Sequence, residues 1–154
     1  MAIQLKGGYH KVTIFNIYND SMHTRNEAVL QNFLTSHRNL VANGNNTHMI
    51  WAGDFNRHHP LWDDNNDMHL FTNQALRNAE GLINLLVEHG MEMALPKGIP
   101  MLQHMCTKKF SMPDNFFCTA NLSQLITKCK VRAQSRPTST DHFPIETHIN
   151  LLQS

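Results

Sequence analysis

The sequence predicts one mixed α/β domain, and three features of the chain support this fold class. Two apolar runs, 12–18 and 48–52, have the length and composition of buried strands. One stretch between these runs and another after them carry apolar residues at the 3.6-residue period of amphipathic helices. From residue 90 onward the chain is rich in turns and strand-like segments. The 154 residues suffice for one domain, and no linker or repeat divides residues 1–154.

The first run, 12–18, is nearly continuous and β-branched, which predicts a strand buried on both faces. Turn-forming residues follow at 19–21, and a helix is then expected to continue until the Asn- and Gly-rich segment 43–46. The apolar face of this helix is formed by Val29, Leu30, Phe33, Leu34, Leu40 and Val41.

The second run leads directly into G-D-F-N at 53–56 and then into a polar loop at 57–67. An amphipathic helix follows, which Gly90 is expected to end. Its apolar face is formed by Ala75, Leu76, Ala79, Leu82, Ile83, Leu86 and Val87. Short strands are expected at 115–118 and 126–132, and alternation over 143–151 predicts a last strand with one covered face.

Composition excludes several classes of protein. The chain is 41% hydrophobic and 16% charged, and its longest apolar runs fall far short of the roughly 18 residues of a membrane span. Residues 1–8 lack the apolar region of a secretory signal, so we expect an intracellular protein. The three widely spaced cysteines, Cys106, Cys118 and Cys129, argue against a disulfide framework or a cysteine zinc site, and buried free thiols are expected.

Charge is unevenly distributed along the chain, although the net charge is only +1. The segment 97–136 carries seven Lys or Arg residues and a single acid, Asp114. Such a segment could face a polyanion, or it could be a solvated surface without a ligand, and the sequence leaves both readings open.

Three polar motifs stand where strands are expected to end or begin. Asp54 and Asn56 are two residues apart, so both side chains could point the same way, the carboxylate handling a water or a metal and the amide orienting it. Asp141 and His142 are adjacent and could place a metal-binding carboxylate and a phosphate-contacting imidazole at the mouth of the last strand. Asp114 could hold a histidine ring and favour its charged form. Ordinary turn and loop chemistry would explain each motif equally well.

Three motifs in this order, G-D-F-N at 53–56, P-D-N-F-F at 113–117 and T-D-H-F-P-I at 140–145, resemble those of the endonuclease/exonuclease/phosphatase superfamily. That superfamily includes deoxyribonuclease I, apurinic endonucleases and the endonuclease domains of non-LTR retrotransposons. The string W-A-G-D-F-N-R-H-H-P-L-W at 51–62 looks like the retroelement branch. The resemblance covers nearly the whole chain from Val12 onward.

The resemblance implies a role for each matching residue. Asp54 matches the aspartate that activates or positions the attacking water, and Asn56 the asparagine that helps to orient it. His142 matches the histidine that contacts the scissile phosphate, and Asp114 matches the aspartate that pairs with it. These groups suit phosphodiester hydrolysis, which needs an in-line water, a base and stabilisation of the developing negative charge.

Two further matches and one departure complete the resemblance. Asp141 matches a carboxylate close to the metal, and Tyr18 stands where the family often has a tyrosine that reaches the phosphate. The resemblance implies Mg²⁺ or Mn²⁺ as cofactor and a four-layer α/β/β/α sandwich with mixed sheets. The family domain begins with strands that supply an asparagine and the principal metal-binding glutamate. No acid precedes Asp20, so we expect these N-terminal strands to be missing.

Three functions remain open on this basis. The first is a metal-dependent DNA endonuclease of retroelement type, which implies DNA as the partner and a cleft that gathers the matching residues. The second is a non-catalytic remnant or interaction module with the same fold. The third is a phosphatase of the same superfamily, against which the basic segment 97–136 and the retroelement-like string argue.

Overall fold

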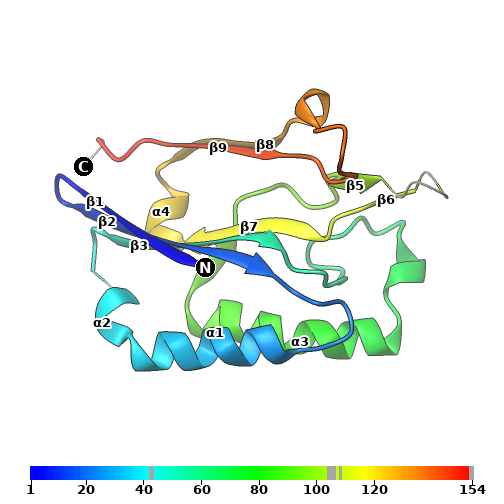
Figure 1. Cartoon of the computed structure of the whole chain (residues 1–154), viewed down its shortest axis with the longest axis horizontal. Helices are drawn as coiled ribbons and strands as arrows, with labels where there is room; N and C mark the ends of the chain where they lie inside the picture. Colours follow the sequence, from blue (N-terminus) through cyan, green and yellow to red (C-terminus); the bar gives the residue numbers. More distant parts are fainter. Residues whose placement is uncertain (42–43, 104–106, 108, 153–154) are drawn as a thin grey trace.

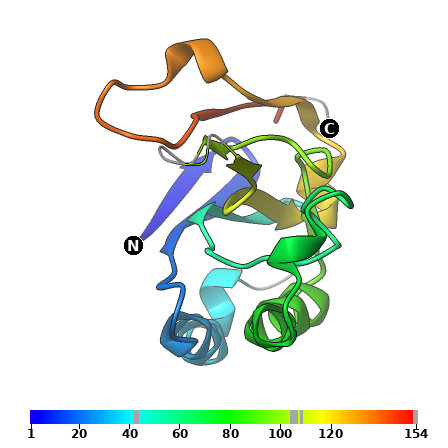
Figure 2. The same cartoon turned by 90° about the vertical axis from the view of Figure 1, so that its right-hand side faces the viewer.

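The centre of the molecule is a five-stranded mixed sheet with two long helices on one face and a two-stranded ribbon on the other (Figures 1 and 2). This computed structural model describes residues 1–41, 44–103, 107 and 109–152. The order of strands in the sheet is β1-β2-β3-β7-β4. These strands are β1 (Ala2–Gly7), β2 (His10–Tyr18), β3 (Thr47–Asp54), β7 (Asp114–Thr119) and β4 (Met91–Met93).

The helices and the remaining strands surround this sheet. The helices are α1 (Arg25–Ser36), α2 (Arg38–Val41), α3 (Asn73–Glu88) and α4 (Ala120–Ser123), with short 3-10 turns η1 (Met68–Leu70) and η2 (Ala133–Ser135). The small strand pairs are β5 (Leu102–Gln103) with β6 (Phe110–Ser111), and β8 (Ile126–Val131) with β9 (Ile145–Ile149). The mixed α/β fold class is therefore confirmed.

Three layers are seen in the described part of the chain: the helices α1 and α3, the five-stranded sheet, and the β8–β9 ribbon (Figure 2). β2 and β3 are parallel and are connected through α1 and α2, whereas the pairs β1–β2, β3–β7 and β4–β7 are antiparallel. The second helical layer of the expected four-layer sandwich is not among the described elements and stays a prediction.

The core lies between the sheet and the two long helices, and it includes the aromatic residue of the G-D-F-N motif. Trp51 and Phe55 are almost fully buried. The ring of Phe55 contacts Phe117 edge-on, with 5.1 Å between the ring centroids, and Trp62 packs against the other side of Phe117 at 6.3 Å. Burying an aromatic side chain contributes about 1.5–3 kcal/mol, so these rings fix the position of the loop that follows β3.

The first helical prediction is wrong in two respects. The helix does not run continuously to residue 41, because α1 ends at Ser36 and α2 begins at Arg38. His37 is the C-cap of α1 with φ −119° and ψ 40°, outside the helical region; its backbone N–H still donates to Phe33 O, and its ring stacks on the Phe33 ring at 4.2 Å. Val29 is 64% exposed, since the buried side of α1 is formed by Glu27, Leu30 and Leu34. The Leu40 and Val41 side chains lie outside the described residues.

The second helix extends to Glu88, with Gly90 in a left-handed conformation just after it, as expected. Val87 is 77% exposed rather than part of the apolar face, and Leu85 is buried instead. The strand 12–18 is buried on both faces only in its first half, where Val12 and Thr13 are buried, while Asn16 and Tyr18 are exposed. Phe15 contacts Phe33 of α1, so by alternation the exposed pair lies on the sheet face away from the helices.

β1 was not predicted, because most of its residues are exposed and it forms one edge of the sheet. Cys118 is buried with its pKa raised by burial to about 12, and Cys129 is partly buried, as expected for free thiols, while Cys106 lies outside the described residues. Among the described helices, none combines the length and apolar character that crossing a bilayer requires.

Candidate active site

The candidate site lies at one edge of the five-stranded sheet, where the register aligns three neighbouring positions. Tyr18 at the end of β2 is opposite Asp54 at the end of β3, and Asp54 is opposite Asp114 at the start of β7. Positions that are opposite one another in paired strands project their side chains from the same face of the sheet. The sheet therefore places the three residues in one row.

The loop after β3 holds Asn56 against Asp54. The Asn56 backbone N–H donates to Asp54 Oδ1 at 3.0 Å, and its side-chain amide donates to Asp54 Oδ2 at 3.0 Å and to Asn19 O at 2.8 Å. Asn56 has a φ of 46°, a left-handed conformation that asparagine tolerates better than most residues. The Phe55 N–H donates to Pro113 O at 2.9 Å, which attaches this loop to the residue before β7.

His142 reaches the row from the segment that precedes β9. The Phe143 N–H donates to Met101 O at 2.7 Å, and His142 forms an isolated bridge with Leu102, so this segment is fixed to β5. The backbone N–H of His142 also donates to Thr140 Oγ1 at 3.1 Å. These contacts place His142 Nδ1 2.6 Å from Asp114 Oδ2, the pairing expected of this histidine and this aspartate.

Asp54, Asp114 and His142 form one cluster, in which a ligand atom of each lies within 4.8 Å of the other two. All three are partly buried. Asp141 is outside this group of three, but its Oδ1 lies 3.9 Å from His142 Nε2 and its side chain is 38% exposed. Tyr18 shares the row by strand register, and its side chain is 72% exposed.

Burial and charge act against each other in this cluster. Burial raises the pKa of Asp54 and of Asp114 above the ordinary carboxyl value, and the partners His142 and Asn56 offset this only in part. Burial alone would lower the pKa of His142, but the hydrogen bond to Asp114 and the charges of the three aspartates raise it overall. The site thus favours an imidazolium beside carboxylates that are poised to accept a proton or a cation.

A buried ion pair, which the sequence did not predict, holds the loop that follows β3. Arg57 and Glu27 are 1% and 7% exposed, and Arg57 Nη2 lies 2.7 Å from Glu27 Oε1. Arg57 also donates to the backbone oxygens of Asp20, His23 and Asn56. No local pattern predicts this pair, because Glu27 is read as a polar helix residue and Arg57 as the start of a polar loop.

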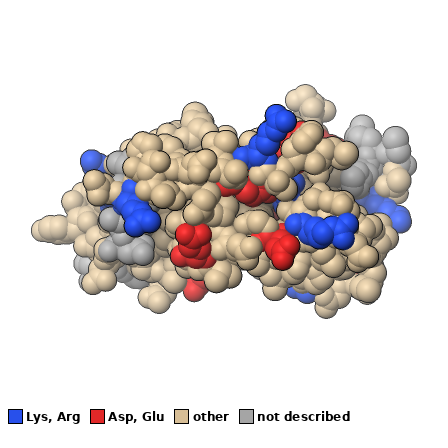
Figure 3. All heavy atoms as spheres, turned by 90° about the horizontal axis from the view of Figure 1, so that it is seen from below, with Lys and Arg blue, Asp and Glu red and all other residues tan. Residues whose placement is uncertain are grey.

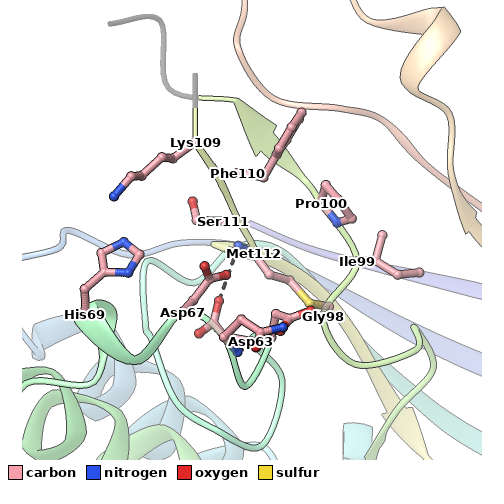
Figure 4. A pocket seen from close by; sticks show the side chains of 12 residues that line it. Asp63, Asp67, His69, Gly98, Ile99, Pro100, Lys109, Phe110, Ser111 and Met112 are labelled. Carbon is pink, nitrogen blue, oxygen red and sulfur yellow. Dashed lines mark hydrogen bonds between the residues drawn. The ribbon is translucent and has the colours of Figure 1, made fainter. Parts of the chain in front are cut away.

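A depression lies between the polar loop 57–67 and the segment 98–112 (Figure 4). Figure 4 shows Asp67 directed into it, with His69 and Lys109 on one side and Pro100 and Phe110 on the other. Asp63 is 1% exposed, and its carboxylate accepts hydrogen bonds from the backbone of His59 and Met112. Asp63 therefore ties the polar loop 57–67 to the strand that leads to Asp114.

A family model described as endonuclease–reverse transcriptase matches residues 12–146. The chain belongs to this family. The match places it in the endonuclease/exonuclease/phosphatase superfamily, as the three motifs predicted. A comparison with curated proteins gives no match.

Solved structures show the fold of this endonuclease–reverse transcriptase family member. The endonuclease domain of TRAS1, a telomere-specific non-LTR retrotransposon, is 21% identical with a TM-score of 0.70, over 97% of this chain and 61% of that one. An AP endonuclease from Archaeoglobus fulgidus is 15% identical with a TM-score of 0.67, over 91% and 62%. The 3′ phosphatase NExo from Neisseria, bound to product DNA hairpin, is 12% identical with a TM-score of 0.66, over 97% and 64%. The chain thus spans less than two thirds of each of these structures.

The family is generally dependent on a divalent metal, and the residues present fit one. Mg²⁺ and Mn²⁺ prefer carboxylate oxygens, which Asp54 and Asp114 supply at the centre of the cluster and Asp141 beside it. Burial raises the pKa of Asp54 and of Asp114, and a bound dication would favour the charged form of both carboxylates. Because His142 Nδ1 is engaged by Asp114, the imidazole is free to act through Nε2.

We expect Asp114→Asn to lower the pKa of His142, because this substitution removes both the charge and the hydrogen bond that raise it. The wild-type ring should stay protonated to a pH above its ordinary midpoint of about 6.5, whereas the variant should lose its proton at lower pH. NMR titration of the His142 ring protons measures both midpoints. Asp67→Asn, which removes a carboxylate from the neighbouring depression, is the control, and equal midpoints in wild type and Asp114→Asn would contradict the pairing.

Proposed function

We propose that this site serves metal-dependent hydrolysis of phosphodiester bonds in DNA, in the manner of a retroelement endonuclease, with Mg²⁺ or Mn²⁺ as cofactor. The observation that carries the proposal is the clustering of Asp54, Asp114 and His142 within 4.8 Å of one another at the edge of the sheet. Membership of a family of phosphodiester-cleaving enzymes supports it.

Each residue has a part in the proposed reaction. Asp54, with a pKa raised by burial, accepts a proton from the attacking water, while the Asn56 amide holds its carboxylate in place. His142, kept protonated by Asp114, donates from Nε2 to a phosphate oxygen as negative charge develops. Tyr18 offers its hydroxyl to the same phosphate. The metal, which Asp141 beside the cluster would hold, would neutralise charge on the phosphate.

The proposal is tested by nicking of supercoiled plasmid with Mg²⁺ or Mn²⁺. We expect His142→Ala to lower the rate at least about 100-fold, because it removes the group that stabilises the transition state. His23→Ala, which removes a histidine that is 59% exposed, should leave the rate unchanged. Metal-dependent cleavage that is equally fast in His142→Ala would contradict the proposal, and release of phosphate from phosphomonoesters without nicking would indicate a phosphatase.

A second candidate function is a non-catalytic module of the same fold. A folded chain that binds DNA but does not nick it with either metal would support this candidate over the endonuclease.

A further inference from the structure

The outer face of the β8–β9 ribbon concentrates positive charge. On the inner face Cys129, Val131, Ile145 and Ile149 pack against the core. By alternation, Lys128, Lys130 and Arg132 project outward from β8 and its end, opposite His148 and Glu146 of β9. Among the described residues the ribbon is the outermost layer on the side of the sheet away from the helices, and no described element covers its outer face (Figures 1 and 2).

One carboxylate stands among these cations and cannot neutralise them all. Glu146 contacts Lys128 Nζ at 2.9 Å, Arg132 Nη1 at 3.1 Å and His148 Nε2 at 2.7 Å. The Lys128 hydrogen bond contributes most to holding the pKa of Glu146 down, at about 2. Repulsion by the Lys128 charge, followed by that of Arg132, lowers the pKa of Lys130. Three basic side chains against one acid leave an excess of positive charge that an anion would relieve.

The opposite side of the molecule is different. Viewed from the helix side, acidic and basic side chains lie interspersed over the surface (Figure 3). Such mixing is typical of a solvated face, whereas the outer face of the ribbon carries three basic side chains against one acid, Glu146. The contrast favours a ligand-binding role for the ribbon over simple solvation.

The charged face is continuous with the candidate active site. The Arg132 N–H donates to Pro144 O at 2.8 Å, two residues after His142. The Arg136 guanidinium lies 5.3 Å from the centroid of the Phe143 ring, which is the next residue after His142. A polyanion that leaves the cleft past Phe143 would therefore meet Arg136, then Arg132, and then the lysines of β8.

The spacing of these cations suits a nucleic-acid backbone. Alternate residues of a strand are about 7 Å apart, so Lys128, Lys130 and Arg132 form a row of positive charge that an extended polyanion can follow. We propose that the outer face of the β8–β9 ribbon, with Lys128, Lys130 and Arg132 as contacts, binds the phosphodiester backbone of a nucleic acid outside the catalytic cleft. This inference rests on the proposed function, because it assumes that the substrate in the cleft is a nucleic acid. Backbone contacts of this kind position a duplex without reading its sequence.

The test is the affinity of the whole chain for a fluorescent DNA duplex, measured by anisotropy over a series of salt concentrations with EDTA present. We expect Lys130→Ala to reduce the slope of log affinity against log salt by about 0.9, the value for one lost phosphate contact. Lys130→Glu should weaken binding at low salt by about tenfold or more. Lys6→Glu makes the same charge change on the exposed edge strand β1 and should weaken it by no more than about twofold.

Each outcome decides the matter, provided that circular dichroism shows the variants folded. Equal losses in Lys130→Glu and Lys6→Glu, or no binding by the wild type, would overturn the proposal. So would a Lys130→Glu defect confined to vesicles of phosphatidylserine and phosphatidylcholine, which would identify the face as a membrane contact. Because no metal or turnover is involved, failure of plasmid nicking leaves this result intact, and loss of the salt effect leaves the nicking result intact.

Discussion

Arg57→Met is expected to lower the free energy of unfolding by about 3–5 kcal/mol, because it leaves the carboxylate of Glu27 buried without its charge partner. The contacts of Arg57 account for the five N–H donors of a guanidinium: two to Glu27 Oε1 and one each to the backbone oxygens of Asp20, His23 and Asn56. Methionine has a similar reach but no donor, so the three backbone oxygens lose the Arg57 donor and Glu27 Oε1 keeps only the Asn19 amide, at 3.2 Å, among its described donors.

Urea unfolding followed by tryptophan fluorescence measures this loss, since Trp51 and Trp62 are both buried in the folded chain. Arg77→Met is the matched control, because Arg77 is exposed on α3 and contacts only Gln74 among the interactions described for it. Its expected effect is within about 0.5 kcal/mol. A similar midpoint for Arg57→Met and Arg77→Met would show that the buried pair contributes little.

The double variant Arg57→Met/Glu27→Met separates the two costs. If the loss in Arg57→Met comes from an unpaired buried carboxylate, removing that carboxylate should recover a substantial part of the stability. Additive losses in the double variant would instead assign the effect to the backbone hydrogen bonds of Arg57. Because Asn56 O accepts one of those bonds, the second outcome would also couple Arg57 to the orientation of Asn56 at the site.

The strands that carry the candidate site could be predicted because each has a strong local signal. The apolar runs before Asp54 and around Phe116 indicate buried strands, and the residues at their ends then lie at the edge of a sheet. The pairing of His142 with Asp114 could be predicted only through the family resemblance, since 27 intervening residues give no local pattern that joins them. The structure brings these side chains together, while their catalytic roles stay predictions.

Features that depend on long-range contacts could not be predicted. β1 has an exposed, alternating sequence that becomes a strand only because β2 offers it an unpaired edge. The Glu27–Arg57 pair joins residues 30 positions apart, and an ionisable residue in a helix is ordinarily expected at the surface. In both cases the deciding partner lies on another element, which a period read along one segment does not show.

Gly53→Ala is expected to destabilise the chain by about 4 kcal/mol or more, because both the backbone conformation and the space at this position require glycine. Its φ of 135° lies in a region that other residues rarely adopt, and an added Cβ would lie 2.1 Å from Ile17 O on the paired strand β2. Relief of that overlap requires β2 and β3 to separate beside Asp54, so the loss of stability and a displaced Asp54 would occur together.

Gly81→Ala provides the opposite result in the same chain. Gly81 lies inside α3, an added Cβ meets no atom within 4 Å, and alanine is favoured over glycine in a helix by about 0.5–1 kcal/mol, so this variant should be more stable than the wild type. Thermal unfolding monitored by circular dichroism compares the two variants directly. A Gly53→Ala protein that melts near the wild-type temperature would mean that β2 and β3 can separate at this point without a loss of folding stability. In that case the glycine of G-D-F-N would not be needed to hold Asp54 in register with Asp114.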